Sequence, residues 1–139
     1  MLNRLLGILF LASVSSGVFA TEHRLTVNVI DAGSRQPIPC RIYLNSSDGK
    51  PYFFSSSADE GTAFKYQKQN WINKQSTEHH TTVSAHPCHA TVPSGVYTLI
   101  VERGKSYFPH QQKIDVSDDD VTVSVSLRRW IDPAALGWY

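Results

Sequence analysis

The histidines are the residues in this chain with the clearest potential for metal chemistry. His79, His80, His86 and His89 lie in one short stretch of sequence. Zinc is held by three or four nitrogen or sulfur ligands in a tetrahedral arrangement, so His80, His86 and His89 are candidate ligands. Their spacing fits neither one face of a strand nor one turn of a helix without a sharp bend. We therefore expect hydrogen-bonded, solvent-facing histidines and no metal or other cofactor.

The two cysteines are Cys40 and Cys88. Each is part of an alternating segment in which it shares a face with apolar residues, so both thiols should point into a core. An even number of cysteines behind an export signal favours a disulfide between Cys40 and Cys88. The chain-entropy model gives a bridge across such a loop about 4 kcal/mol of stabilisation. The alternative is a pair of separate buried thiols that act as small apolar groups.

No group of residues assembles into a catalytic site. The sequence has no nucleophile motif of the G-x-S-x-G type, and the acidic run 118–120 is typical of a solvated turn. Aromatic side chains could stack on a sugar, with Tyr52, Phe54 and Trp71 as the residues that would have to line one groove. Packing in the core is the other reading of these rings. We expect a protein that is not an enzyme, with binding of a carbohydrate or another small ligand as an alternative function.

The start of the chain and its charge indicate the compartment. The chain has 139 residues, and 13 Lys and Arg against 12 Asp and Glu give a net charge of +1. This balance argues against a nucleic-acid partner. Residues 1–20 read as a signal peptide, with Arg4, an apolar run and a cleavage site after Ala20. We expect a secreted or periplasmic protein with no membrane association after cleavage.

Alternation of apolar and polar residues predicts an all-β fold. Segments 25–30, 40–44, 88–92, 96–102, 112–116 and 121–127 alternate or are strongly apolar, and 79–83 is a further candidate strand. Residues 50–80 are polar and irregular, and 132–136 should form a short helical turn. About seven strands with no helix between them predict an antiparallel β-sandwich over residues 21–129.

Several sequence blocks go beyond a generic sandwich. The blocks are Val29-Ile-Asp31, Gln36-Pro-Ile-Pro39, Ile42-Tyr-Leu44, Pro93-Ser-Gly-Val-Tyr-Thr-Leu99, Asp48-Gly-Lys-Pro-Tyr-Phe53, His80-Thr-Thr-Val-Ser-Ala-His-Pro87, Val101-Glu-Arg-Gly-Lys105, Leu127-Arg-Arg-Trp-Ile-Asp132 and Gly137-Trp-Tyr139. The first four resemble the carboxypeptidase-regulatory or transthyretin-like sandwich. The whole set resembles the N-terminal domain of secreted CehA/McbA-type metallohydrolases, whose catalytic domain is PHP-like.

The resemblance implies an accessory role. In that family the Gly-Trp-Tyr segment leads into Ser-Gly-Asp-x-His-x-His, whose Asp and His residues begin the metal site. The given sequence ends at Tyr139, so the family's hydrolase activity transfers to none of its residues. What the resemblance implies is the fold and a position beside a catalytic domain.

The end of the chain is unusually apolar. We name residues 130–139 the C-terminal segment, and we expect it to need a partner surface because exposed termini are usually polar. Its large apolar residues are Trp130, Ile131, Leu136, Trp138 and Tyr139. The main functional hypothesis is a non-catalytic accessory or interaction module, a fragment or remnant of a metal-dependent hydrolase. Its partner would be a hydrolase catalytic domain or another extracytoplasmic protein. A record cut short from a full metallohydrolase is the other alternative.

Overall fold

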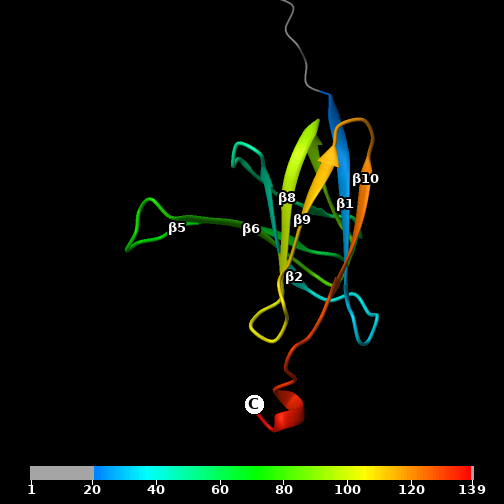
Figure 1. Cartoon of the computed structure of the whole chain (residues 1–139), viewed down its shortest axis with the longest axis vertical. Coiled ribbons are helices and arrows are strands. Elements are labelled where there is room, and N and C mark those ends of the chain that lie inside the picture. Colours follow the sequence, from blue (N-terminus) through cyan, green and yellow to red (C-terminus); the bar gives the residue numbers. More distant parts are fainter. Residues whose placement is uncertain (1–20, 139) are drawn as a thin grey trace, which may run out of the picture.

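The protein is a sandwich of two packed β-sheets, seen here in a computed structural model that describes residues 21–138 (Figure 1). The predicted signal peptide and Tyr139 lie outside the described residues. The all-β expectation is confirmed. The elements are β1 (Glu22–Asp31), β2 (Cys40–Ser46), β3 (Pro51–Tyr52), β4 (Ser55–Ser56), β5 (Ala63–Gln69), β6 (Thr77–Val83), β7 (Cys88–Pro93), β8 (Gly95–Glu102), β9 (His110–Val116), β10 (Val121–Leu127) and the 3₁₀-helix η1 (Ala134–Leu136).

The smaller sheet has the strand order β10-β1-β7-β4, and the larger has the order β5-β6-β2-β8-β9 with β3 added beside β2. Neighbouring strands are antiparallel with one exception. β1 and β10 run parallel, from Leu25 opposite Val121 to Asp31 opposite Leu127. The first and last strands therefore lie side by side, and both end at the same edge of the sandwich.

The predicted alternation produces the core. Leu25, Val27 and Val29 of β1 are buried, as are Ile42 and Leu44 of β2. The intervening residues of these strands are half-buried or exposed. Because side chains alternate across a strand, β1 and β2 each contribute one apolar face to the space between the sheets.

The stretch 50–80 differs from its prediction as irregular chain. It contains β3, β4 and β5 and the start of β6. β5 and β6 form a hairpin that projects sideways from the sandwich (Figure 1). β5 has no fully buried residue, so it lacks the apolar alternation by which a half-buried strand is recognised.

The chain after β10 bears out another prediction. The expected helical turn is present as η1, and Gly137 closes it with φ of 72°, a left-handed conformation that suits glycine. Among residues 21–138, no helix has the length and apolar character needed to cross a membrane.

Candidate interaction site at the C-terminal segment

The base of the C-terminal segment is bound to the β8–β9 loop. Phe108 donates its backbone N–H to Arg128 O at 3.0 Å, and Trp130 donates its own to Ser106 O at 3.0 Å. The Trp130 indole Nε1 donates to Lys105 O. These bonds continue a ladder beyond the end of β10, so the chain leaves the sandwich in a fixed direction.

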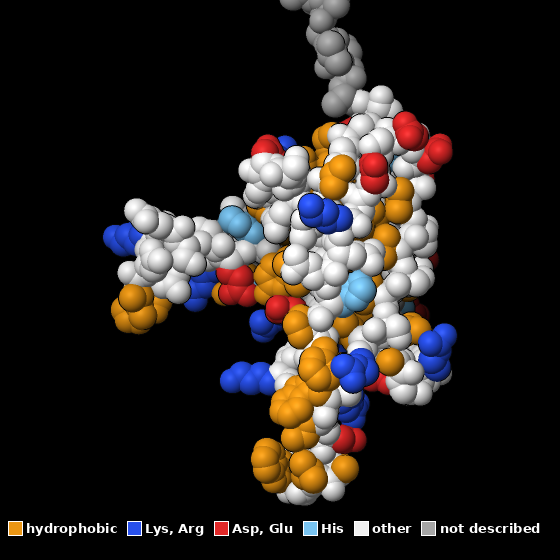
Figure 2. All heavy atoms as spheres, in the orientation of Figure 1, with side chains coloured by type: hydrophobic (Ala, Val, Ile, Leu, Met, Phe, Trp, Pro, Cys, Tyr) orange, Lys and Arg blue, Asp and Glu red, His pale blue; other side chains and the backbone are white. Residues whose placement is uncertain are grey.

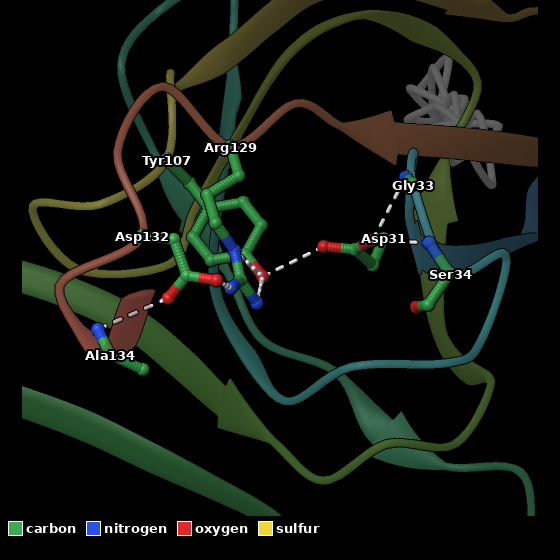
Figure 3. A network of polar contacts seen from close by, with 7 residues as sticks. All are labelled: Asp31, Gly33, Ser34, Tyr107, Arg129, Asp132 and Ala134. Atoms are coloured by element: carbon green, nitrogen blue, oxygen red, sulfur yellow. Dashed lines mark hydrogen bonds and ion pairs between the residues drawn. The ribbon is translucent and has the colours of Figure 1, made fainter. Parts of the chain in front are cut away.

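A buried carboxylate starts the polar network beside this ladder (Figure 3). Asp31, at the end of β1, accepts backbone hydrogen bonds from Ser34 at 2.7 Å and Gly33 at 2.9 Å. Its Oδ2 accepts from the Tyr107 hydroxyl at 2.7 Å. The Ser34 and Tyr107 hydrogen bonds stabilise the charged form and lower the pKa of Asp31 to about 2.

Tyr107 links this carboxylate to the C-terminal segment. Its hydroxyl accepts from Arg129 Nη2 at 2.8 Å and Nε at 3.1 Å. Arg129 Nη1 then pairs with Asp132 Oδ2 at 2.9 Å, and Asp132 Oδ1 accepts from the Ala134 N–H at 3.2 Å. The hydrogen bonds that Arg129 donates to the Tyr107 hydroxyl raise the pKa of Arg129. We name Asp31, Tyr107, Arg129 and Asp132 the anchor network.

Cations surround the base of the C-terminal segment. The Arg128 guanidinium lies 4.3 Å from the centre of the Phe108 ring, and that of Arg103 lies 5.6 Å from the centre of the Tyr107 ring. An open cavity of about 410 Å³ lies between the β8–β9 loop and the C-terminal segment, and Arg103, Lys105 and Arg129 are among its lining residues. The surface around the segment is thus basic.

The far part of the segment is apolar and exposed. Trp130 is 56% exposed, Leu136 56% and Trp138 67%, whereas Ile131 is half-buried. Figure 2 shows these hydrophobic side chains gathered at the end of the molecule with Lys and Arg beside them. Tyr139 lies outside the described residues. The structure therefore combines a hydrogen-bonded base with an exposed apolar end.

The predicted disulfide is absent, because Cys40 and Cys88 are both free thiols. The prediction that both point inward is confirmed, since both are buried. They lie on different sheets, and the Cys88 thiol donates to Val27 O at 3.6 Å. Burial raises the pKa of each thiol to about 12. The alternative of two separate buried thiols that act as small apolar groups therefore describes the structure.

The three candidate metal ligands occupy separate environments. His80 in β6 lies between Tyr66 and Tyr43, His86 is exposed in the turn after β6, and His89 in β7 hydrogen-bonds Ser57 Oγ at 2.9 Å. Among residues 21–138, no three His, Cys, Asp or Glu side chains are placed to share a metal ion. The expectation of solvent-facing histidines is wrong for His80, which is only 4% exposed.

The proposed sugar-binding aromatics do not line one groove. Phe54 is in the core at 4% exposure, Tyr52 packs edge-on against Tyr97 at 5.4 Å, and Trp71 is 81% exposed on the hairpin. An open cavity of about 240 Å³ on the hairpin includes Trp71 and Tyr66 but neither of the other two. Core packing accounts for Phe54 and for much of Tyr52.

Sequence reasoning found the exposed tryptophans but not the anchor network. Asp31, Arg129 and Asp132 all belong to the sequence blocks that carry the resemblance, and none of them continues an apolar alternation. The polar character of these three residues within the blocks was the signal that could have indicated the anchor network. Nothing in the sequence around Tyr107 indicated its part in the network.

Comparison of the sequence with protein-family models gave no match, and comparison with curated proteins gave none either. The likeness to the N-terminal domain of CehA/McbA-type metallohydrolases thus rests on the quoted residues and stays a prediction.

Proposed function

We propose that this chain is a non-catalytic, extracytoplasmic accessory module that docks onto a partner through its C-terminal segment. The partner we propose is a metal-dependent hydrolase domain of the type that the sequence resembles. The observation that carries the proposal is the anchor network. It fixes the base of the segment while Leu136 and Trp138 remain exposed.

The geometry supports docking over a loose terminal tail. A flexible tail would need no buried carboxylate, and keeping Asp31 charged inside the fold requires the hydrogen bonds that it receives. Those bonds fix the direction in which the segment leaves the sandwich. A fixed direction lowers the entropy cost of association, because the apolar side chains are already placed.

The basic surface around the segment indicates the charge of the partner surface that would bind it. A partner that covers Leu136 and Trp138 would also approach Arg103 and Lys105. Carboxylates at the rim of an apolar pocket would complement this surface.

The first test is to read the gene beyond the codon for Tyr139. A continuous or frameshifted frame encoding Ser-Gly-Asp-x-His-x-His supports the proposal, because the partner is then the next domain. A stop codon with no such frame contradicts a hydrolase domain on the same chain, and the partner must then be a separate protein.

The second test uses the protein that such a frame encodes. Leu136→Ser and Trp138→Ser should separate its thermal unfolding into two transitions, because each removes apolar area from the joint between domains. Trp71→Ser is the matched control, since it removes an equally large exposed ring from a distant hairpin, and it should leave unfolding unchanged. Unchanged unfolding in all three variants would contradict docking through this segment.

A further inference from the structure

The β5–β6 hairpin carries a second exposed apolar surface, far from the C-terminal segment (Figure 1). Its strands pair from Ala63 opposite Val83 to Gln69 opposite Thr77, and residues 70–76 connect them. Trp71 is 81% exposed and Ile72 is 78% exposed in this connection. We name residues 70–76 the hairpin tip.

The hairpin tip is closed by its own hydrogen bonds. Asn70 donates its N–H to Ser76 O at 2.8 Å, and its Oδ1 accepts from the N–H groups of Ile72 at 2.8 Å and Asn73 at 2.9 Å. Ser76 donates to Asn73 O at 2.9 Å. These groups keep their partners when the tip leaves water, so transfer into a less polar medium costs less.

Aromatic packing holds the strands of the hairpin, β5 and β6, to the rest of their sheet. The His80 ring stacks on Tyr66 with centroids 4.6 Å apart, and its other neighbour, Tyr43, lies at 5.2 Å. Phe53 lies edge-on to His79 at 6.4 Å. The packed rings therefore hold the two strands of the hairpin in place, and the tip lies at the outer end of these strands, away from the sandwich.

The charge on the hairpin is positive. Residues 63–83 contain Lys65, Lys68 and Lys74 against the single carboxylate Glu78. That carboxylate is already engaged, since it accepts from the Tyr43 hydroxyl at 3.3 Å and lies 3.2 Å from His80 Nδ1. Lys74 belongs to the tip, and Lys68 lies opposite Glu78 in the second-to-last strand pair before the tip.

We propose that the hairpin tip inserts into an anionic lipid surface. Trp71 and Ile72 enter the boundary between headgroups and acyl chains, and Lys68 and Lys74 contact the lipid phosphates. Tryptophan favours this boundary, and lysines near an anionic bilayer are attracted to it. The lipid surface departs from the sequence-based expectation of no membrane association, and it uses a surface that the proposed docking function does not need.

Two observations favour lipid over a sugar or a protein. Ile72 is as exposed as Trp71, yet an aliphatic chain adds nothing to stacking on a sugar. The two side chains stand at the end of a narrow projection, and a fluid surface accommodates such a shape without a matching pocket.

The test is flotation of the mature chain, residues 21–139, with two kinds of vesicle. Vesicles of phosphatidylcholine mixed with phosphatidylglycerol should bind the protein and shift its tryptophan emission to shorter wavelength. Vesicles of phosphatidylcholine alone should bind it more weakly, and added salt should weaken the binding to anionic vesicles. Failure of the unmodified protein to float with anionic vesicles overturns the proposal.

Variants assign the binding to the tip. Trp71→Ser combined with Ile72→Ser should lower vesicle affinity by about tenfold or more, and Lys68→Gln or Lys74→Gln by about fivefold each. Trp138→Ser is the matched control and should retain the affinity of the unmodified protein. Circular dichroism spectra of the variants report whether the sandwich is intact. If the double variant binds normally while Trp138→Ser does not, the lipid contact belongs to the C-terminal segment and the proposal is wrong.

Discussion

The C-terminal segment and the β5–β6 hairpin both hold tryptophan away from the sandwich, but different interactions support them. The C-terminal segment depends on ionic and hydrogen-bonded groups that join β1, the β8–β9 loop and the chain after β10. The hairpin depends on stacked rings and on bonds within its own tip. Because the first network spans distant parts of the chain, we expect the C-terminal segment to open only with the global fold and the hairpin to open locally.

The largest predicted effect removes the centre of the anchor network. Tyr107→Phe deletes the hydroxyl that joins Asp31 to Arg129, and we expect it to lower the free energy of unfolding in urea by about 1–2 kcal/mol. Tyr107→Ala also removes a buried ring and should cost about 3–5 kcal/mol. The difference between the variants separates ring packing from the network. A Tyr107→Phe variant as stable as the unmodified protein would mean that the network does not anchor the segment.

Acid should distinguish the two regions. Burial lowers the pKa of His80 below its usual 6.5 despite the nearby Glu78, so its ring is held neutral. When the hairpin opens, the His80 ring regains its usual pKa and binds a proton more readily than in the folded state. The contribution of His80 to hairpin stability is therefore fully present above about pH 6.5, and it is lost as the pH falls from there through the lowered pKa of the folded state. The pKa of Asp31 is lowered from 3.8 to about 2, so its contribution persists above 3.8 and is lost between these values.

Hydrogen-exchange protection factors measure this difference. At about pH 5 we expect lower protection in β5 and β6 and unchanged protection at the Phe108 and Trp130 amides. His80→Phe keeps an aromatic ring in the stack and should abolish the pH dependence in the hairpin. Equal loss of protection in both regions would contradict the assignment of the acid response to His80.

Side-chain packing holds the two sheets of the core together, with no disulfide between Cys40 and Cys88. We expect no alkylation of Cys40 or Cys88 by iodoacetamide in the folded protein and alkylation of both after unfolding, since burial raises each thiol pKa to about 12. Intact mass spectrometry counts the adducts. An unreduced protein that is lighter by two hydrogens and takes up no label even when unfolded would show that the bridge exists.

The smallest predicted effect is shared by both regions. Trp71→Ser and Trp138→Ser should each change the free energy of unfolding by less than about 0.5 kcal/mol, because both rings are mostly exposed. Urea unfolding with paired controls resolves such a change. A clearly larger loss in either variant would mean that the ring packs on the sandwich and is not held for a partner.

The sequence predicted the elements whose burial is local. Leu25, Val27 and Val29 alternate within β1, and that period is visible without knowledge of any neighbour. The parallel pairing of β1 with β10 could not be predicted from local sequence patterns, because it joins strands from opposite ends of the described chain. The candidate strand 79–83 is confirmed as part of β6, whereas its partner β5 was missed because β5 has no fully buried residue and therefore no apolar alternation.

The candidate site divides in the same way. The apolar composition of the C-terminal segment was evident from Trp130 to Trp138. Its anchoring was not, because Asp31, Tyr107 and Arg129 come from three separate segments. The disulfide prediction failed because an even number of cysteines and inward-facing side chains are equally compatible with two free buried thiols, which the structure shows.

The central claim is that the C-terminal segment joins the sandwich to a hydrolase partner. Its most direct test is native mass spectrometry of the protein isolated from its source with antibodies to the sandwich. We predict a species heavier than residues 21–139, either a longer polypeptide containing Ser-Gly-Asp-x-His-x-His or a stoichiometric complex with a protein containing it. Residues 21–139 alone, with nothing bound, would contradict the claim.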